Sequence, residues 1–115
     1  MSLDNWDAVV AFARGLPDVS MASYYGALSP KVNGKAFVSP SREEGSFHVA
    51  SPHDEKAVLM ETDPDAFWQT AHYANWPGLL VRYGADDEDR IRLVITRAWW
   101  DKASKAQRAA FGERP

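Results

Sequence analysis

The sequence predicts a single α+β domain, and three observations support that prediction. The chain has 115 residues, 45% of them hydrophobic and 25% charged, which is the composition of an ordinary globular domain. Apolar residues recur at helical spacing near both ends of the chain. Between residues 19 and 51 the pattern changes to short alternating segments separated by turns, which indicates an antiparallel meander. We therefore expect one domain spanning residues 1–115, with helices packed on an antiparallel sheet.

The first helix is predicted to begin after Asp4, because an aspartate can cap a helix by accepting a backbone hydrogen bond. Four apolar residues follow at the spacing of one buried helical stripe. These residues are Trp6, Val9, Val10 and Ala13. We expect the helix to end at Gly15-Leu16-Pro17, because Gly15 can take a left-handed conformation and Pro17 cannot continue a helix.

Four strands are expected in the next part of the chain. They are Val19–Tyr25, Leu28–Val32, Lys35–Ser39 and Ser46–Ala50. Asn33-Gly34 joins the second strand to the third and is the strongest two-residue hairpin signal, since both turn positions need positive φ. The polar segment Ser41–Gly45 predicts a loop before the fourth strand.

A short helix is expected next, with Ser51 as its cap and Pro52 at its first helical position. It should run to about Glu61 and end before Asp63-Pro64, because a proline pushes the preceding residue out of the helical conformation. Ala66–Thr70 then predicts a short strand.

The stretch from Thr62 to Gly84 contains two of the five tryptophans and one of the three histidines. Its turn Trp76-Pro77-Gly78 leads into a buried strand, Leu79–Tyr83. His72 and Tyr73 precede that turn, and each has an apolar ring with a polar tip that must find a partner. The pair therefore either faces a ligand or caps the core and bonds nearby carbonyls.

The longest helix is expected from about Asp87 to Ala103, and acidic residues at its start suit the positive end of the helix dipole. Its predicted core stripe consists of Ile91, Val94, Ile95, Ala98 and Trp99. Leu93 and Trp100 form a second apolar strip on roughly the opposite side, which needs a cover. Either the segment Ser104–Phe111 folds back over this strip, or the strip forms a weak homodimer contact.

Composition and motifs exclude several classes of protein. The chain has no cysteine, which excludes disulfides and thiolate chemistry, and no apolar run approaches the roughly 20 residues of a membrane-spanning helix. We expect no signal peptide. No phosphate-binding loop, nucleophile elbow or His-Glu-x-x-His motif occurs. His48, His53 and Asp54 are ordinary metal-ligand types, but a strand residue and two residues of a helix start have no fixed mutual geometry. We therefore expect a cytoplasmic monomer or weak homodimer that is not an enzyme and has no metal or cofactor.

Two sets of side chains are candidates for binding a partner. The DNA-binding candidates are Lys31, Lys35, Arg42 and Arg82, because lysines at a hairpin can contact the phosphate backbone. The alternative is a groove for a small molecule or peptide, in which a cation beside aromatic rings receives a carboxylate. The residues of that groove are Tyr24, Trp68, His72, Tyr73, Trp76 and Arg82. The net charge of -3 means that DNA binding would need a local basic face.

Several short motifs also follow one another along nearly the whole chain. They are the Trp6-Asp7 helix ending in Leu16-Pro17, Asn33-Gly34-Lys35-Ala36-Phe37, Asp63-Pro64, Phe67, Thr70, His72-Tyr73, Pro77, Leu80-Val81-Arg82, Ala98-Trp99 and Ala109-Ala110-Phe111. Together they resemble the MmcQ/YjbR-like family of small bacterial proteins. The resemblance implies an α+β fold like that of secretion chaperones, with a helix, a three-stranded meander, a helix, two strands and a long C-terminal helix. It also implies a double-wing motif that is predicted to bind DNA, and no catalytic residues.

Overall fold

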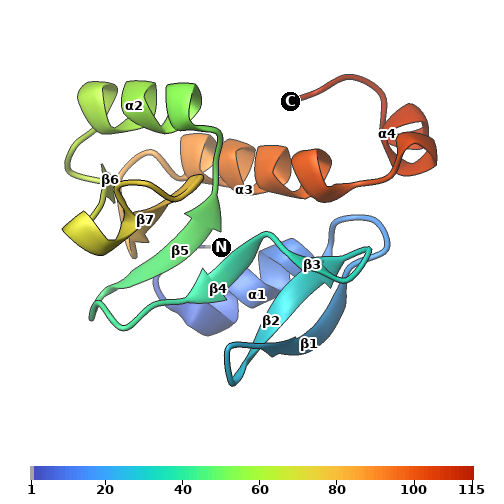
Figure 1. The fold of residues 1–115 in the computed structure, drawn as a ribbon, viewed down its shortest axis with the longest axis horizontal. Helices are drawn as coiled ribbons and strands as arrows, with labels where there is room; N and C mark the ends of the chain where they lie inside the picture. Colours follow the sequence, from blue (N-terminus) through green and yellow to red (C-terminus); the bar gives the residue numbers. More distant parts are fainter. Residues whose placement is uncertain (1) are drawn as a thin grey trace.

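The computed structural model describes residues 2–115 as an α+β fold, which confirms the predicted fold class (Figure 1). The helices are α1 (Trp6–Arg14), α2 (His53–Thr62), the 3-10 helix η1 (Ala71–Tyr73), α3 (Glu88–Lys102) and α4 (Lys105–Phe111). The strands are β1 (Ser20–Tyr24), β2 (Ala27–Val32), β3 (Lys35–Ala36), β4 (Val38–Pro40), β5 (Ser46–Ala50), β6 (Phe67–Trp68) and β7 (Gly78–Arg82). Within residues 2–115, no helix is long and apolar enough to cross a membrane.

The strands form two antiparallel sheets, one in the order β1-β2-β3 and the other in the order β4-β5-β7-β6. The chain passes from the first sheet to the second at Phe37, so the prediction of one strand over Lys35–Ser39 is wrong. Phe37 and Val38 are each only 1% exposed. Neighbouring residues of a regular strand point to opposite faces. The backbone therefore changes sheet at Phe37, which lets both side chains enter the core.

The predicted hairpin at Asn33-Gly34 is confirmed, with φ angles of 53° and 75°. The Asn33 amide also ties this hairpin to the C-terminal helices. Its Nδ2 donates to the Lys102 carbonyl oxygen at 3.1 Å and to Gln107 Oε1 at 2.8 Å. An Asn at this turn therefore supplies both the backbone conformation and a tertiary contact.

The helix ends differ from the predictions in detail. Asn5, and not Asp4, caps α1, because the side chain of Asn5 accepts from the backbone N–H of Ala8. Gly15 follows α1 with a φ of -75°, so no left-handed residue ends this helix. Pro52 is itself the N-terminal cap of α2, and the hydroxyl of the buried Ser51 caps no backbone N–H.

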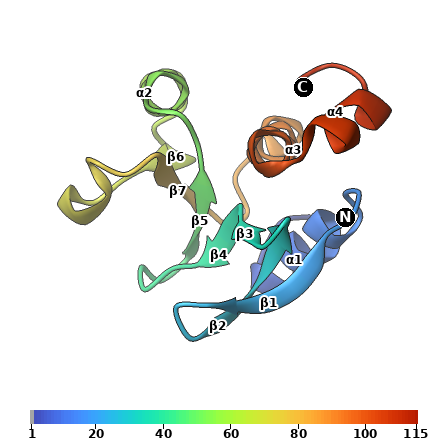
Figure 2. The same cartoon turned by 45° about the vertical axis from the view of Figure 1, so that its right-hand side comes forward.

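The core lies where α1 and α3 cover the inner faces of the two sheets (Figure 2). All five residues of the predicted α3 stripe are buried. The ring of Phe111 lies 5.1 Å from Trp99 and 6.0 Å from Trp100, measured between centroids, so the C-terminal segment covers Trp100 as one of the two predictions had it. Leu93 keeps 37% of its surface exposed.

Candidate functional site

The outer face of the four-stranded sheet carries an unusual set of side chains. Directly paired residues of antiparallel strands share a face. Ser46 of β5 pairs with Arg82 of β7, and Leu80 of β7 pairs with both His48 of β5 and Trp68 of β6. These residues therefore lie on the face opposite the core. Leu80 is fully buried there, which shows that something covers this face.

Tyr73 of the loop between β6 and β7 packs on His48 of β5 on this face. These two residues form an aromatic cluster with His72 and Trp76 of the same loop. The Tyr73 ring lies 5.1 Å from that of His48 and 5.0 Å from that of His72, measured between centroids. The Trp76 ring lies 6.1 Å from His72 and 6.2 Å from Tyr73. Trp76 is 38% exposed, so the cluster runs from the half-buried His48 out to solvent. His72, Tyr73 and Trp76 were all predicted as groove residues.

Lys56 of α2 binds the backbone of this loop. Its side chain reaches from α2, and the residue is only 4% exposed. Its Nζ lies within hydrogen-bond distance of four backbone carbonyl oxygens, those of Tyr73 at 2.9 Å, Ala74 at 3.3 Å, Trp76 at 2.8 Å and Gly78 at 3.1 Å. The three N–H groups of the ammonium are shared among them. Burial lowers the pKa of Lys56. The carbonyl dipoles oppose that effect because they favour the charged ammonium.

His48 is the inner end of the aromatic cluster. Burial lowers the pKa of its imidazole to about 4, and the charge of Lys56 adds to the shift. The ring is therefore neutral at neutral pH. Its Nε2 is buried and has no hydrogen-bond partner among residues 2–115. Such a ring serves as a packing platform for Tyr73, and His48 was considered in the sequence only as a metal ligand.

Trp68 and Arg82 form the other end of the face. The guanidinium carbon of Arg82 lies 4.8 Å from the centroid of the Trp68 ring. Arg82 Nη1 donates to the carbonyl oxygens of Pro64 and Asp65, both at 3.1 Å, and Trp68 Nε1 donates to Ser46 Oγ at 3.0 Å. These bonds fix the guanidinium over the indole while Arg82 stays exposed.

Tyr24 lies on the other sheet, at the end of β1. Its ring lies 4.6 Å from that of Tyr25, measured between centroids. Burial raises the pKa of Tyr24, and Tyr25 and Tyr73 add to the rise. Lys31 Nζ lies 5.8 Å from the Tyr24 ring centroid and donates to the Ser23 carbonyl oxygen at 2.7 Å. Tyr25 beside it is 84% exposed and was not predicted as a site residue.

The four basic residues predicted to bind DNA are spread over both sheets. Lys31 and Arg82 are engaged with backbone carbonyls as described, and each lies beside a ring. Lys35 is exposed at the start of β3, directly after the β2–β3 turn, and Arg42 is exposed in the β4–β5 loop. That turn and that loop lie on opposite sides of the molecule in Figure 1.

Comparison of the chain with protein-family models, with curated proteins and with solved structures finds no match. Within residues 2–115, no group of three or more His, Asp or Glu side chains could hold a metal ion.

Sequence reasoning missed Lys56, and one signal could have found it. Lys56 and Leu59 are three residues apart, so they share a face of α2, and both are buried. A lysine on the same helical face as a core leucine needs acceptors for its ammonium group. The spacing of Lys56 and Leu59 does not predict which carbonyl oxygens accept its hydrogen bonds, because these lie more than a dozen residues away along the chain.

Proposed function

We propose that this protein is a non-enzymatic binding domain whose ligand is a short peptide segment carrying a carboxylate. The peptide would lie over the side chains that cover the outer sheet face, with apolar groups against the aromatic cluster and the carboxylate at Arg82. One observation carries the proposal: Arg82, fixed 4.8 Å above Trp68, shares this face with the exposed rings of His72 and Trp76. Exposed aromatic rings beside a placed guanidinium are typical of sites that bind an apolar group and an anion together.

The length of the face favours a peptide over a small molecule. Gly78, two residues after Trp76, and Arg82 are the two ends of β7. Four steps of about 3.4 Å along a strand separate them by roughly 14 Å. An extended peptide of about four residues has that length, whereas a small molecule would reach only one end.

A selection from a random heptapeptide library on the immobilised protein tests this proposal. We expect the selected peptides to contain an aromatic and an acidic residue, and to lose binding at least about tenfold to the variants Arg82→Gln and Trp76→Ala. Replacement of the acidic residue in the peptide by its amide should weaken binding to wild type but not to Arg82→Gln. Lys35→Gln, on the other sheet, is the matched control. Failure to enrich any peptide, or equal binding to all variants, would refute the proposal.

We propose DNA binding as the second function, together with membership of the MmcQ/YjbR-like family that the sequence resembles. The order of helix, three-stranded meander, strands, helix, strands and long helix supports this proposal. A specific observation also favours it: Lys31 lies beside Tyr24 and Arg82 beside Trp68, so cations and stacking rings occur in pairs.

A titration of labelled duplex and single-stranded DNA at low and moderate salt tests the second function. We compare wild type with the Lys31→Ala, Lys35→Ala, Arg42→Ala triple variant and with Arg82→Gln. Binding that falls linearly in log salt and is lost in these variants would support DNA binding. No binding at low salt would refute it and would leave the peptide proposal untouched.

We also propose a monomer in the cytoplasm. The cysteine-free sequence supports the location. The contact of Phe111 with Trp100 supports the monomer, because it removes half of the apolar strip that a homodimer through Leu93 and Trp100 would use. A mass near twice 12.8 kDa by light scattering, reduced by Leu93→Ser, would favour the homodimer instead.

A further inference from the structure

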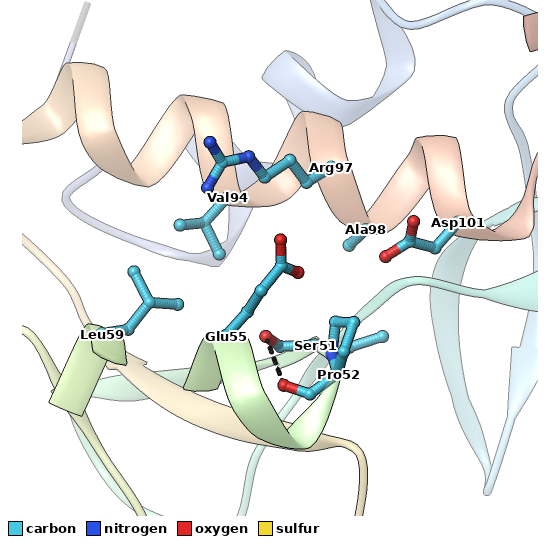
Figure 3. A pocket seen from close by; sticks show the side chains of 9 residues that line it. Ser51, Pro52, Glu55, Leu59, Val94, Arg97, Ala98 and Asp101 are labelled. Atoms are coloured by element: carbon cyan, nitrogen blue, oxygen red, sulfur yellow. Dashed lines mark hydrogen bonds between the residues drawn. The ribbon is translucent and has the colours of Figure 1, made fainter. Parts of the chain in front are cut away.

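A second candidate site lies in the groove between α2 and α3. Leu59, Val94 and Ala98 form its apolar floor, and the side chains of Glu55 from α2 and Asp101 from α3 point into it (Figure 3). Two carboxylates from different helices are thus directed at one place. Like charges held this close repel each other unless a cation lies between them.

The guanidinium of Arg114 lies between these two carboxylates and pairs with both. Its two Nη atoms donate to the two carboxylate oxygens of Glu55 at 2.5 and 2.7 Å. Its Nε and Nη2 donate to the two carboxylate oxygens of Asp101, both at 3.1 Å. One guanidinium therefore makes a two-bond contact with each of two carboxylates. A lysine cannot reproduce this planar arrangement, so the groove is selective for arginine.

The backbone around Arg114 is held as well. Arg97 Nε donates to the Pro115 carbonyl oxygen at 2.5 Å. Gly112 has a φ of 122° and a ψ of -120°, a conformation that residues with a side chain rarely adopt, and it turns the chain back after α4. Residues 112–115 consequently run back over α3 toward α2 (Figure 1).

The occupying segment is attached by polar contacts at the surface. The side chains of Arg114, Glu55 and Asp101 are 35%, 28% and 31% exposed. These paired contacts hold Arg114 more firmly than a single surface ion pair would. The segment nevertheless adds nothing to the core, because residues 112–114 are exposed and Pro115 is only half-buried. Residues 112–115 can therefore leave the groove without unfolding the domain, and their departure would leave two carboxylates and the Arg97 donor in place.

We propose that the α2–α3 groove is a binding site for an arginine side chain in an extended peptide segment of a partner protein. Residues 112–115 are its internal, displaceable occupant. Glu55 and Asp101 recognise the guanidinium, and Arg97 recognises the peptide carbonyl that follows it. This site is separate from the outer sheet face, so its test does not depend on the peptide proposed there.

The test uses the Arg114→Ala variant and the probe peptide acetyl-Gly-Glu-Arg-Pro-amide, followed by ¹H–¹⁵N NMR of the full chain. Removal of the Arg114 side chain should allow the probe to bind with a Kd on the order of 1 mM, and the amide chemical shifts of α2 and α3 should change. Wild type should bind it at least about tenfold more weakly, because its own segment competes at a high effective concentration. A peptide with lysine in place of arginine should bind neither protein.

The matched controls decide between recognition and general charge attraction. Adding Glu55→Gln and Asp101→Asn to Arg114→Ala should abolish the shifts, whereas adding Asp54→Asn, an exposed residue of the same helix, should not change them. Equal binding by wild type and Arg114→Ala, or equal binding of the arginine and lysine peptides, would overturn the proposal. Unfolding of Arg114→Ala would also overturn it, since a segment that the fold requires is not displaceable.

Discussion

Gly78 lies directly against the imidazole of His48. A Cβ placed on Gly78 would be 2.5 Å from His48 Nε2 and 2.9 Å from the Val49 carbonyl oxygen. The His48 ring thus fills the space that a side chain at position 78 would need. This absence of a side chain allows His48 to lie beneath the loop between β6 and β7, where Tyr73 packs on it.

The first prediction concerns this contact. Gly78→Ala should lower the free energy of unfolding by about 1–3 kcal/mol, because the methyl group must displace the ring or the β5 backbone. Urea denaturation measures the loss. Gly15→Ala is the control, since Gly15 has a φ of -75° and needs no left-handed conformation, and its effect should stay within about 0.5 kcal/mol. Equal stability of the two variants would contradict the close packing of Gly78 on His48.

The second prediction concerns the ammonium group beneath the loop. Lys56→Met keeps the length and the apolar stem of the side chain but removes the donor to four carbonyl oxygens. We expect a loss of about 2–3 kcal/mol, because the carbonyl of the buried Gly78 has no access to water while the others can be hydrated. Urea denaturation of Lys56→Met beside the exposed control Lys35→Met measures it. A loss no larger than that of the control would show that the carbonyl contacts do not hold the loop.

The third prediction is a pH dependence that comes from His48. Its pKa is about 4 in the folded protein against 6.5 for a free side chain. As the pH falls below 6.5, the unfolded chain takes up the proton first, so stability is lost between pH 6.5 and 4 and is unaffected by this group above that window. The full effect is on the order of 3 kcal/mol.

His48→Phe isolates this effect. It keeps a ring under Tyr73 and removes both the titration and the unpartnered Nε2. Thermal or urea unfolding at pH 7 and pH 5 should therefore show a smaller acid loss for His48→Phe than for wild type. His53→Gln, at the exposed start of α2, is the control and should retain the wild-type slope. An unchanged slope in His48→Phe would assign the acid loss to other groups.

Local patterns predicted the parts of this fold that depend on neighbours in the chain. The α3 stripe and the strand Ser46–Ala50 follow from periodicity, and both are present as predicted. Periodicity does not predict the change of sheet at Phe37. A strand that stays in one sheet and a strand that crosses to another can have the same alternating sequence, and only their tertiary contacts differ. The same distinction between local and distant contributions applies to the candidate site. His72, Tyr73 and Trp76 stand close together in the sequence, whereas the contributions of His48 and Lys56 depend on contacts between distant elements.

The last prediction concerns the cover of Trp100. Phe111 contacts both Trp99 and Trp100 and is 40% exposed, so Phe111→Ala removes a half-buried ring and should cost about 1–2 kcal/mol, less than truncation of a fully buried one. The exposed Trp100 should shift the tryptophan emission to longer wavelength and, together with Leu93, should promote self-association that light scattering detects. Ala110→Ser, one residue earlier on α4, is the matched control and should change neither quantity. If Phe111→Ala leaves emission, stability and mass unchanged, the C-terminal helix does not cover this face in solution, and the strip through Leu93 and Trp100 must be protected in another way.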